Sequence, residues 1–230
     1  MKIISLDHFF DISQTDYPEI YEDLEYPWEV IPRIADVLQG NLEACVGGTI
    51  KGNAWIGDEV SVGEGTVVEP GAVIKGPAII GKNCEVRSGA YIRKNVIVGN
   101  DVVVGHSTEL KNSLVHDSAE IPHFAYVGDS VIGWKGHLGA GVKISNFKVT
   151  REQVRVHLQG ETYRTGLRKF GCLLGDRVEL GCNSVVNPGT LLGKGTLSVA
   201  NASLRGYYPP DSFVKIDQNP QTFPRGENQN

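Results

Sequence analysis

Residues 50–80 read IKGNAWIGDEVSVGEGTVVEPGAVIKGPAII, and an aliphatic residue returns in this stretch every six positions. The spacing continues to Ile144, with two shorter steps of five residues at Leu110–Val115 and Val127–Ile132. Neither a helix nor a single strand returns to one face at this period over so long a stretch, whereas a coil of short strands joined by tight corners does. The repeat therefore predicts an all-β fold, a parallel β-helix in which each coil buries its apolar side against its neighbours. The handedness does not follow from the repeat.

The composition is that of one solenoid domain with short appendages. The chain has 230 residues, 40% of them hydrophobic, and a formal net charge of −5, which gives no sign of nucleic-acid or membrane partners. It shows no CxxC spacing and no secretory or transmembrane segment, so a cytoplasmic location is expected. The four cysteines, Cys45, Cys84, Cys172 and Cys182, are expected to be buried and unpaired.

The first residues, 1–41, lack the repeat and are predicted to form an N-terminal cap with a short helix. Trp28, Ile31, Ile34 and Leu38 would lie on one side of that helix, and Gly40 would end it. We expect this segment to cover the first coil, whose apolar end would otherwise face water. The β-helix domain is then residues 42–216.

Departures from a regular repeat are the positions where function is expected. The two short steps enclose Lys111, His116, His123, Tyr126 and Asp129. Histidine can accept and return a proton near neutral pH, and His123 should project from a flat face or a corner. The alternatives are structural: Lys111 as a solvated corner residue, Tyr126 as cover for a coil face, and His116 as a surface residue.

Four histidines lie between positions 106 and 137, and such a cluster can indicate a zinc site. The γ-class carbonic anhydrases use this repeat with three histidine ligands. Here His106 is followed five residues later by Lys111, so the triad is incomplete and no metal site is predicted.

The segment YPWEVIPRIADVL (26–38) resembles the helix that joins the two halves of sugar-1-phosphate nucleotidyltransferases with a β-helical tail. Further motifs follow in order along the chain: GAYIR (89–93), ELKNS (109–113), PHFAYVGD (122–129) and KFGCLLGD (169–176). Together they resemble the acetyltransferase half of the bifunctional N-acetylglucosamine-1-phosphate uridylyltransferase/glucosamine-1-phosphate acetyltransferase, within the hexapeptide-repeat acyltransferase superfamily. The resemblance covers approximately residues 76–212. No Gly-rich nucleotide loop is present, so nucleotidyl transfer is not expected.

The resemblance implies a left-handed β-helix, a homotrimer, and acetyl-CoA-dependent acetyl transfer to an amino sugar 1-phosphate or related nucleotide sugar, with no metal required. His123 falls on the family's general base. Residues matching the family's acceptor-binding positions are Arg93, Lys111, Tyr126, His137, Asn146 and Lys169, the last from a neighbouring subunit. Residues matching the acetyl-CoA channel are Ala140, Cys182 and Ala200.

Three departures leave the acceptor open. His137 stands for a family asparagine, Phe147 for a tyrosine and Cys182 for a serine. A site that hydrogen-bonds its substrate discriminates strongly on such contacts. The alternatives are a different acyl group, or a catalytically silent β-helix that binds sugar phosphates or partners a separate nucleotidyltransferase.

Between residues 147 and 173 the repeat stops for a predicted loop insertion with an excess of lysine and arginine. Its alternation at 153–159 predicts a β-hairpin that turns at Gln159 and Gly160. The insertion is either a solvated arm or a segment that reaches a neighbouring subunit's sugar phosphate. Residues 217–230 are predicted to be a flexible tail.

Overall fold

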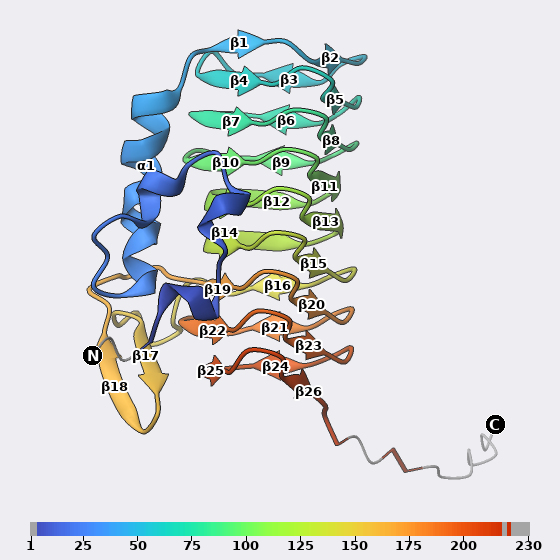
Figure 1. Ribbon diagram of the computed structural model, residues 1–230. Coiled ribbons are helices and arrows are strands. Elements are labelled where there is room, and N and C mark those ends of the chain that lie inside the picture. The colour runs from blue at the N-terminus through green and yellow to red at the C-terminus, as the bar shows by residue number, and fades with distance from the viewer. Residues whose placement is uncertain (1–3, 218–219, 222–230) are drawn as a thin grey trace, which may run out of the picture.

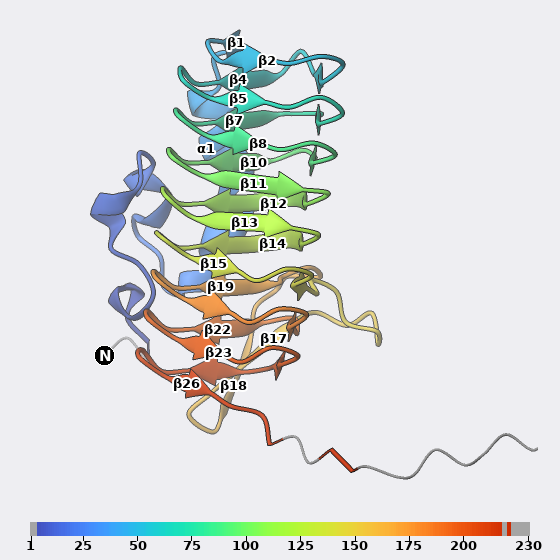
Figure 2. The ribbon, with the colours of Figure 1, turned by 90° about the vertical axis from the view of Figure 1, so that its right-hand side faces the viewer.

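The computed structural model describes residues 4–217 and 220–221, and most of it is a parallel β-solenoid of about nine turns (Figure 1). The chain runs from left to right across the near face in Figure 2 while it descends, so the coil is left-handed. The predicted left-handed parallel β-helix is therefore confirmed. Most of the predicted tail lies outside the described residues.

Each turn contributes to three faces, which we number in the order in which the chain visits them. The first face contains β1 (Cys45–Val46), β4 (Val60–Val62), β7 (Ala78–Ile80), β10 (Val96–Val98), the second halves of β12 (Glu109–Val115) and β14 (Tyr126–Ile132), β19 (Cys172–Leu174), β22 (Thr190–Leu192) and β25 (Tyr207–Tyr208). The second face contains β2 (Thr49–Ile50), β5 (Val67–Val68), β8 (Glu85–Val86), β11 (Val103–His106), β13 (Glu120–His123), β15 (His137–Leu138), β20 (Glu179–Leu180), β23 (Leu197–Ser198) and β26 (Phe213–Val214). The third face contains β3 (Trp55–Ile56), β6 (Val73–Ile74), β9 (Tyr91–Ile92), the first halves of β12 and β14, β16 (Lys143–Ile144), β21 (Val185–Val186) and β24 (Ser203–Leu204).

The core follows the hexapeptide aliphatics. Val62, Ile80, Val98, Val115 and Ile132 stack in register on the first face and are fully buried or nearly so. Their counterparts on the other two faces belong to the same cluster. Each coil is therefore stabilised mainly by apolar contact with the coils above and below it.

The two five-residue steps shorten one corner of the solenoid, the one between the third and first faces. Three residues, 93–95, separate β9 from β10, but only Lys111 and Asn112 lie between the two paired halves of β12. The strand then continues through the corner, and Asn112 adopts a φ of 45° and Asp129 a φ of 50°. Short polar residues tolerate this left-handed conformation. We call this the contracted corner.

The N-terminal segment packs along the first face instead of over the first coil. It consists of η1 (Leu6–His8), η2 (Ile12–Gln14), η3 (Pro18–Tyr21), η4 (Pro27–Glu29) and α1 (Val30–Asn41). Ile31, Ile34 and Leu38 of α1 are buried with outward-facing residues of that face, such as Ile97 and Leu114. The expectation of a cap over the first coil is wrong, because the apolar side of α1 is buried against the outward-facing aliphatic residues of the first face. Within the described residues, no helix is both long enough and apolar enough to cross a bilayer.

Two other expectations are wrong: that His116 lies on the surface, and that all four cysteines are buried. His116 is fully buried, not on the surface, because Phe10 and Tyr21 of the N-terminal segment close over it. Cys84 and Cys172 are buried as expected, whereas Cys45 and Cys182 are exposed, and all four are free thiols. The exposed pair lies outside the interior ladder.

The insertion contains the predicted hairpin, formed by β17 (Arg155–Leu158) and β18 (Glu161–Arg164), which pair antiparallel. The turn residues Gln159 and Gly160 both have positive φ, as a tight two-residue turn requires. The arm is not fully solvated, since Val156 and Leu158 are buried and Tyr163 packs near Trp28.

Candidate functional site

The largest described pocket, about 780 Å³ in volume, opens at the contracted corner. Successive coils contribute its floor, α1 contributes one wall through Ile31 and Pro32, and the end of the insertion contributes the rim. We call it the corner pocket. Its lining residues are Ile31, Pro32, Arg93, Lys111, Asn112, Tyr126, Asp129, Asn146, Phe147, Leu167, Arg168 and Lys169.

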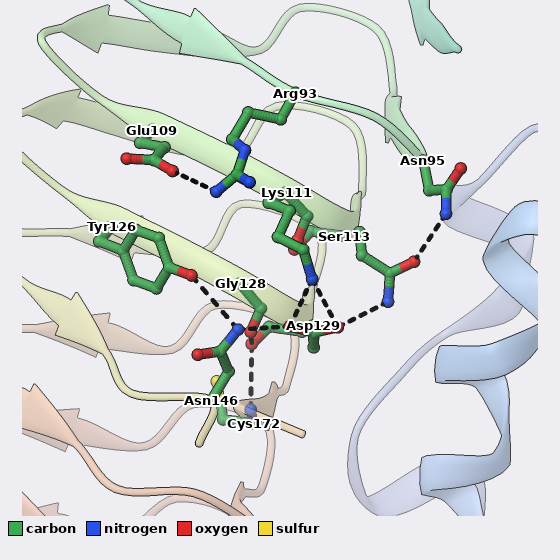
Figure 3. A network of polar contacts seen from close by, with 12 residues as sticks. Arg93, Asn95, Glu109, Lys111, Ser113, Tyr126, Gly128, Asp129, Asn146 and Cys172 are labelled. Atoms are coloured by element: carbon green, nitrogen blue, oxygen red, sulfur yellow. Dashed lines mark hydrogen bonds and ion pairs between the residues drawn. The ribbon is translucent and has the colours of Figure 1, made fainter. Parts of the chain in front are cut away.

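A buried carboxylate lies at the centre of the corner pocket (Figure 3). The Asp129 side chain is only 6% exposed, and Nζ of Lys111 lies 3.1 Å from both of its oxygens. Asn112 and Asn146 also donate to it through their Nδ2 atoms. A charge in such a position is tolerated only when it is paired and hydrogen-bonded. Asp129 therefore fixes the side chains that three successive coils present to the pocket.

Tyr126 leans from the third face toward the same network. Its hydroxyl accepts a hydrogen bond from Nδ2 of Asn146 at 3.2 Å. A Cβ atom at Gly128 would lie 2.6 Å from that hydroxyl and 2.6 Å from Asn146 Nδ2, so only glycine leaves room for the contact. Burial, followed by the charge of Asp129, raises the pKa of Tyr126, which keeps the phenol protonated.

The rim of the corner pocket is basic. Arg93 forms an ion pair with Glu109 at 2.9 Å. Arg168 and Lys169 are exposed and form no ion pair within the described part of the chain. An anion in the pocket would therefore meet two uncompensated cations at its edge.

The structure brings five of the six predicted acceptor-binding residues into the corner pocket: Arg93, Lys111, Tyr126, Asn146 and Lys169. Phe147 lines it as well. Lys169 joins the pocket of its own chain, whereas the resemblance implied a neighbouring subunit.

His123 lies at a different corner, between the second and third faces. It ends β13, is exposed, and its ring has no hydrogen bond or ion pair within the described residues. Backbone bonds stack this corner in a column: Phe124 N–H donates to His106 O, Gly141 N–H to His123 O, Asn183 N–H to Ala140 O, and Asn201 N–H to Cys182 O. The column of His106, His123, Ala140, Cys182 and Ala200 is called the histidine corner below.

The histidine corner thus gathers all the residues predicted for catalysis and for acetyl-CoA. Ala140, Cys182 and Ala200 are exposed or half-buried on the coils below His123. His106, one coil above, donates from Nδ1 to Ser88 O at 2.6 Å and packs its ring edge-on to Phe124. These positions were assigned by resemblance alone, and their alignment in one column is a property of the fold.

His137 is separate from both corners. It starts β15 on the second face, and its Nδ1 lies 3.0 Å from Glu120, with Glu179 next to it in register. It lines a shallow hollow with these two carboxylates, away from the other acceptor-binding candidates. Its part in acceptor binding stays a prediction.

Sequence reasoning missed four residues that line the corner pocket: Ile31, Pro32, Asn112 and Leu167. It also gave Asp129 no role. The available signal was the pair of five-residue steps, which set the corner at Asn112 and Asp129 apart from the regular coils. No local signal marks the approach of α1, which is a long-range contact.

The fold and the corner pocket define a hexapeptide-repeat β-helix protein with a polar, anion-compatible site at one corner. The family described as the GMPPB C-terminal domain matches residues 74–202, and the chain belongs to it. The chain also matches the C-terminal region of bifunctional GlmU proteins, which confirms the resemblance seen in the sequence.

The matches to individual proteins are partial. The bifunctional protein GlmU of Methanococcus aeolicus is 32% identical over 194 residues, covering 84% of this chain and 47% of that protein. The GlmU protein of Methanococcus maripaludis strain C7 is 41% identical over the same length, with the same coverage. The chain therefore spans about half the length of these curated relatives. A solved Arabidopsis UDP-N-acetylglucosamine acyltransferase is 17% identical, with a TM-score of 0.46, covering 67% of this chain and 58% of that one.

Proposed function

We propose that this protein transfers an acetyl group from acetyl-CoA to an amino sugar 1-phosphate or a related nucleotide sugar. The relatives in Methanococcus and the solved plant protein are named as GlmU proteins and as an acyltransferase, which supports acyl transfer to a sugar-related acceptor. The acceptor, the general base and the assembly are parts of the proposal.

The observation that carries the proposal is the corner pocket. Five residues chosen from the sequence for acceptor binding line one cavity, although they come from five separated positions between residues 93 and 169. Lys111, Arg93 and Lys169 supply cationic donors for a phosphate. The Tyr126 hydroxyl can donate to a sugar oxygen, while Asn146, whose Nδ2 already donates to Asp129 and Tyr126, offers its Oδ1 as an acceptor for a sugar hydroxyl. Such a clamp orients a small anionic sugar before it reacts.

The reaction requires a base for the attacking amine. In the proposed step, the acceptor nitrogen forms a bond to the thioester carbonyl carbon of acetyl-CoA and the C–S bond breaks. His123 takes the proton from nitrogen and passes it to the departing thiolate, so CoA leaves as the thiol. The free, exposed imidazole of His123, three residues from Tyr126 across the corner, suits this role.

Acetyl-CoA would lie along the histidine corner beside Ala140, Cys182 and Ala200. These three residues have small side chains, are exposed or half-buried, and lie on successive coils in the same column as His123, which supports this placement. A homotrimer is proposed on the resemblance, and its neighbouring subunit would close the space above the third face.

A binding module is the second candidate. It is favoured by one observation: His123 does not line the corner pocket of its own chain. In that case the corner pocket would retain sugar phosphates without transfer, and the histidine corner would have no chemical role.

The decisive experiment measures thiol release from acetyl-CoA with a panel of amino sugar 1-phosphates and nucleotide amino sugars. Wild type is compared with His123→Ala and with the matched control His8→Ala, an exposed histidine far along the chain from either corner. Turnover with one acceptor that disappears only in His123→Ala supports the proposal. Sugar-phosphate binding without turnover in any variant supports the binding module instead.

A further inference from the structure

A second pocket continues the corner pocket toward the C-terminal coils. It has a volume of about 300 Å³, near the lower limit for a small-molecule site, and Phe147 lines both cavities. Asn187 and Arg205 come from the next two coils at the same corner, and Arg155 and His157 come from β17 of the insertion. We call it the basic pocket.

The lining of the basic pocket is positively charged, whereas the chain as a whole is negatively charged. Lys148, Arg155, Arg205 and His157 line it, and no acidic side chain does, although the whole chain carries a formal net charge of −5. Lys148 is paired with Glu152 at 2.9 Å. Arg155 has no ion pair within the described residues, and Arg205 reaches only the neutral Asn187 oxygen at 3.3 Å. Two guanidinium groups are therefore available for an anionic ligand.

The two pockets lie at different heights along the solenoid axis, which the positions of Lys111 in the corner pocket and Asn187 in the basic pocket show. Lys111 and Asn187 lie on rungs three steps apart, through β14 and β16. Neighbouring rungs are about 4.8 Å apart, which places them roughly 14 Å apart along the axis. The single phosphate of a sugar 1-phosphate is attached directly to the sugar ring, so it cannot contact the corner pocket and the basic pocket at the same time.

We infer that the basic pocket binds the nucleoside and the nucleoside-side phosphate of a nucleotide-linked amino sugar, whose sugar lies in the corner pocket. Arg155 and Arg205 would bind that phosphate, and the Phe147 ring between the pockets would pack against the bound molecule. The inference rests on the proposed function only in taking the corner pocket as the acceptor site. The acceptor is then a nucleoside diphosphate sugar in preference to a free sugar 1-phosphate.

CoA also carries a nucleotide with phosphates, so the source of the ligand must be distinguished. The position of the basic pocket favours the acceptor, because it shares a corner and a lining residue with the corner pocket. The residues proposed for acetyl-CoA lie at the histidine corner, on the other side of the third face.

Calorimetric binding tests the inference without requiring turnover. The probes are glucosamine 1-phosphate, UDP-glucosamine, GDP-glucosamine and acetyl-CoA, measured with wild type and with the double variant Arg155→Gln/Arg205→Gln. We expect one nucleotide sugar to bind wild type at least about tenfold more tightly than glucosamine 1-phosphate, and the double variant to lose that advantage. Each lost charge-assisted bond corresponds to about a tenfold change or more.

The matched control is Arg151→Gln, an exposed arginine of the same insertion that lines neither the corner pocket nor the basic pocket. Its affinities should stay within about twofold of wild type. The inference would be overturned if neither nucleotide sugar bound wild type more tightly than glucosamine 1-phosphate, or if the double variant lost affinity for acetyl-CoA alone. Selective nucleotide-sugar binding without acetyl transfer would leave the inference standing while rejecting the proposed function, and transfer to the sugar 1-phosphate without nucleotide preference would do the opposite.

Discussion

The two corners that border the third face are built in opposite ways. At the contracted corner the chain saves one residue on each of two coils, and Lys111, Asn112, Asp129 and Asn146 become interlocked and largely shielded from water. At the histidine corner every coil keeps its regular length, and His123 remains exposed with a free ring. A shortened corner thus provides a hydrogen-bonded polar pocket, while a regular corner leaves the histidine side chain accessible.

The largest effect should come from the regular corner. Removing the proposed base by His123→Ala is expected to lower kcat by about 10² to 10⁴ fold, the usual contribution of general base catalysis. Because the side chain is exposed, the thermal unfolding midpoint should hardly change. Steady-state kinetics with circular-dichroism melting checks both. An equal fall in stability would show that His123 is a structural residue.

At the contracted corner the main effect should be on stability. Asp129→Asn keeps a residue that tolerates positive φ but removes the partner of the largely buried Lys111, which should cost about 3 kcal/mol of unfolding free energy. Urea denaturation measures this cost. The control is Asp101→Asn, an exposed aspartate with a φ of 56° at a regular corner, which should change stability by less than about 0.5 kcal/mol. Similar values for the two variants would show that the network contributes nothing special.

The third corner, between the first and second faces, differs from the other two because the N-terminal segment covers it at His116. His116 is buried there against Phe10 and Tyr21, and burial lowers its pKa to about 3. Its pKa in the unfolded chain is about 6.5, so the unfolded state binds a proton more readily between these two values. The free energy of unfolding is therefore unaffected by His116 above pH 6.5. It decreases as the pH drops toward 3, and the decrease is roughly 2 kcal/mol at pH 5.

Urea unfolding at pH 5 and pH 7.5 measures this effect. His116→Phe should reduce the pH dependence, and His8→Ala should preserve it. An unchanged slope in His116→Phe would assign acid sensitivity to other groups.

The smallest effect should come from Gly128→Ala. The new methyl group would push Tyr126 and Asn146 apart, raising KM for the acceptor by about tenfold at a cost of about 1 kcal/mol in stability. Gly40→Ala in α1 is the matched control, since a Cβ there meets no atom within 4 Å, and helix propensity predicts a small gain in stability. An unchanged KM in Gly128→Ala would mean that the Tyr126–Asn146 contact is not needed for acceptor binding.

Much of the site was predictable because the repeat converts sequence spacing into position. Lys111, Tyr126 and Asn146 fall on consecutive coils, so a motif match placed them on one side of the solenoid. His116 was misjudged because its neighbours Phe10 and Tyr21 are about a hundred positions away in the chain. The path of the insertion places Lys169 at the pocket of its own chain, and its contact with a neighbouring subunit stays a prediction.

The sequence by itself determined the β-helix, its interior ladder, the shortened coils and the hairpin, because each depends on contacts between residues at a fixed spacing or within a few positions. The tertiary structure decided which face α1 covers, how deeply Asp129 and His116 are buried, and that Phe147 lines both the corner pocket and the basic pocket. These features depend on which distant segments pack over the apolar surface, and the spacing of residues in the sequence does not predict that packing.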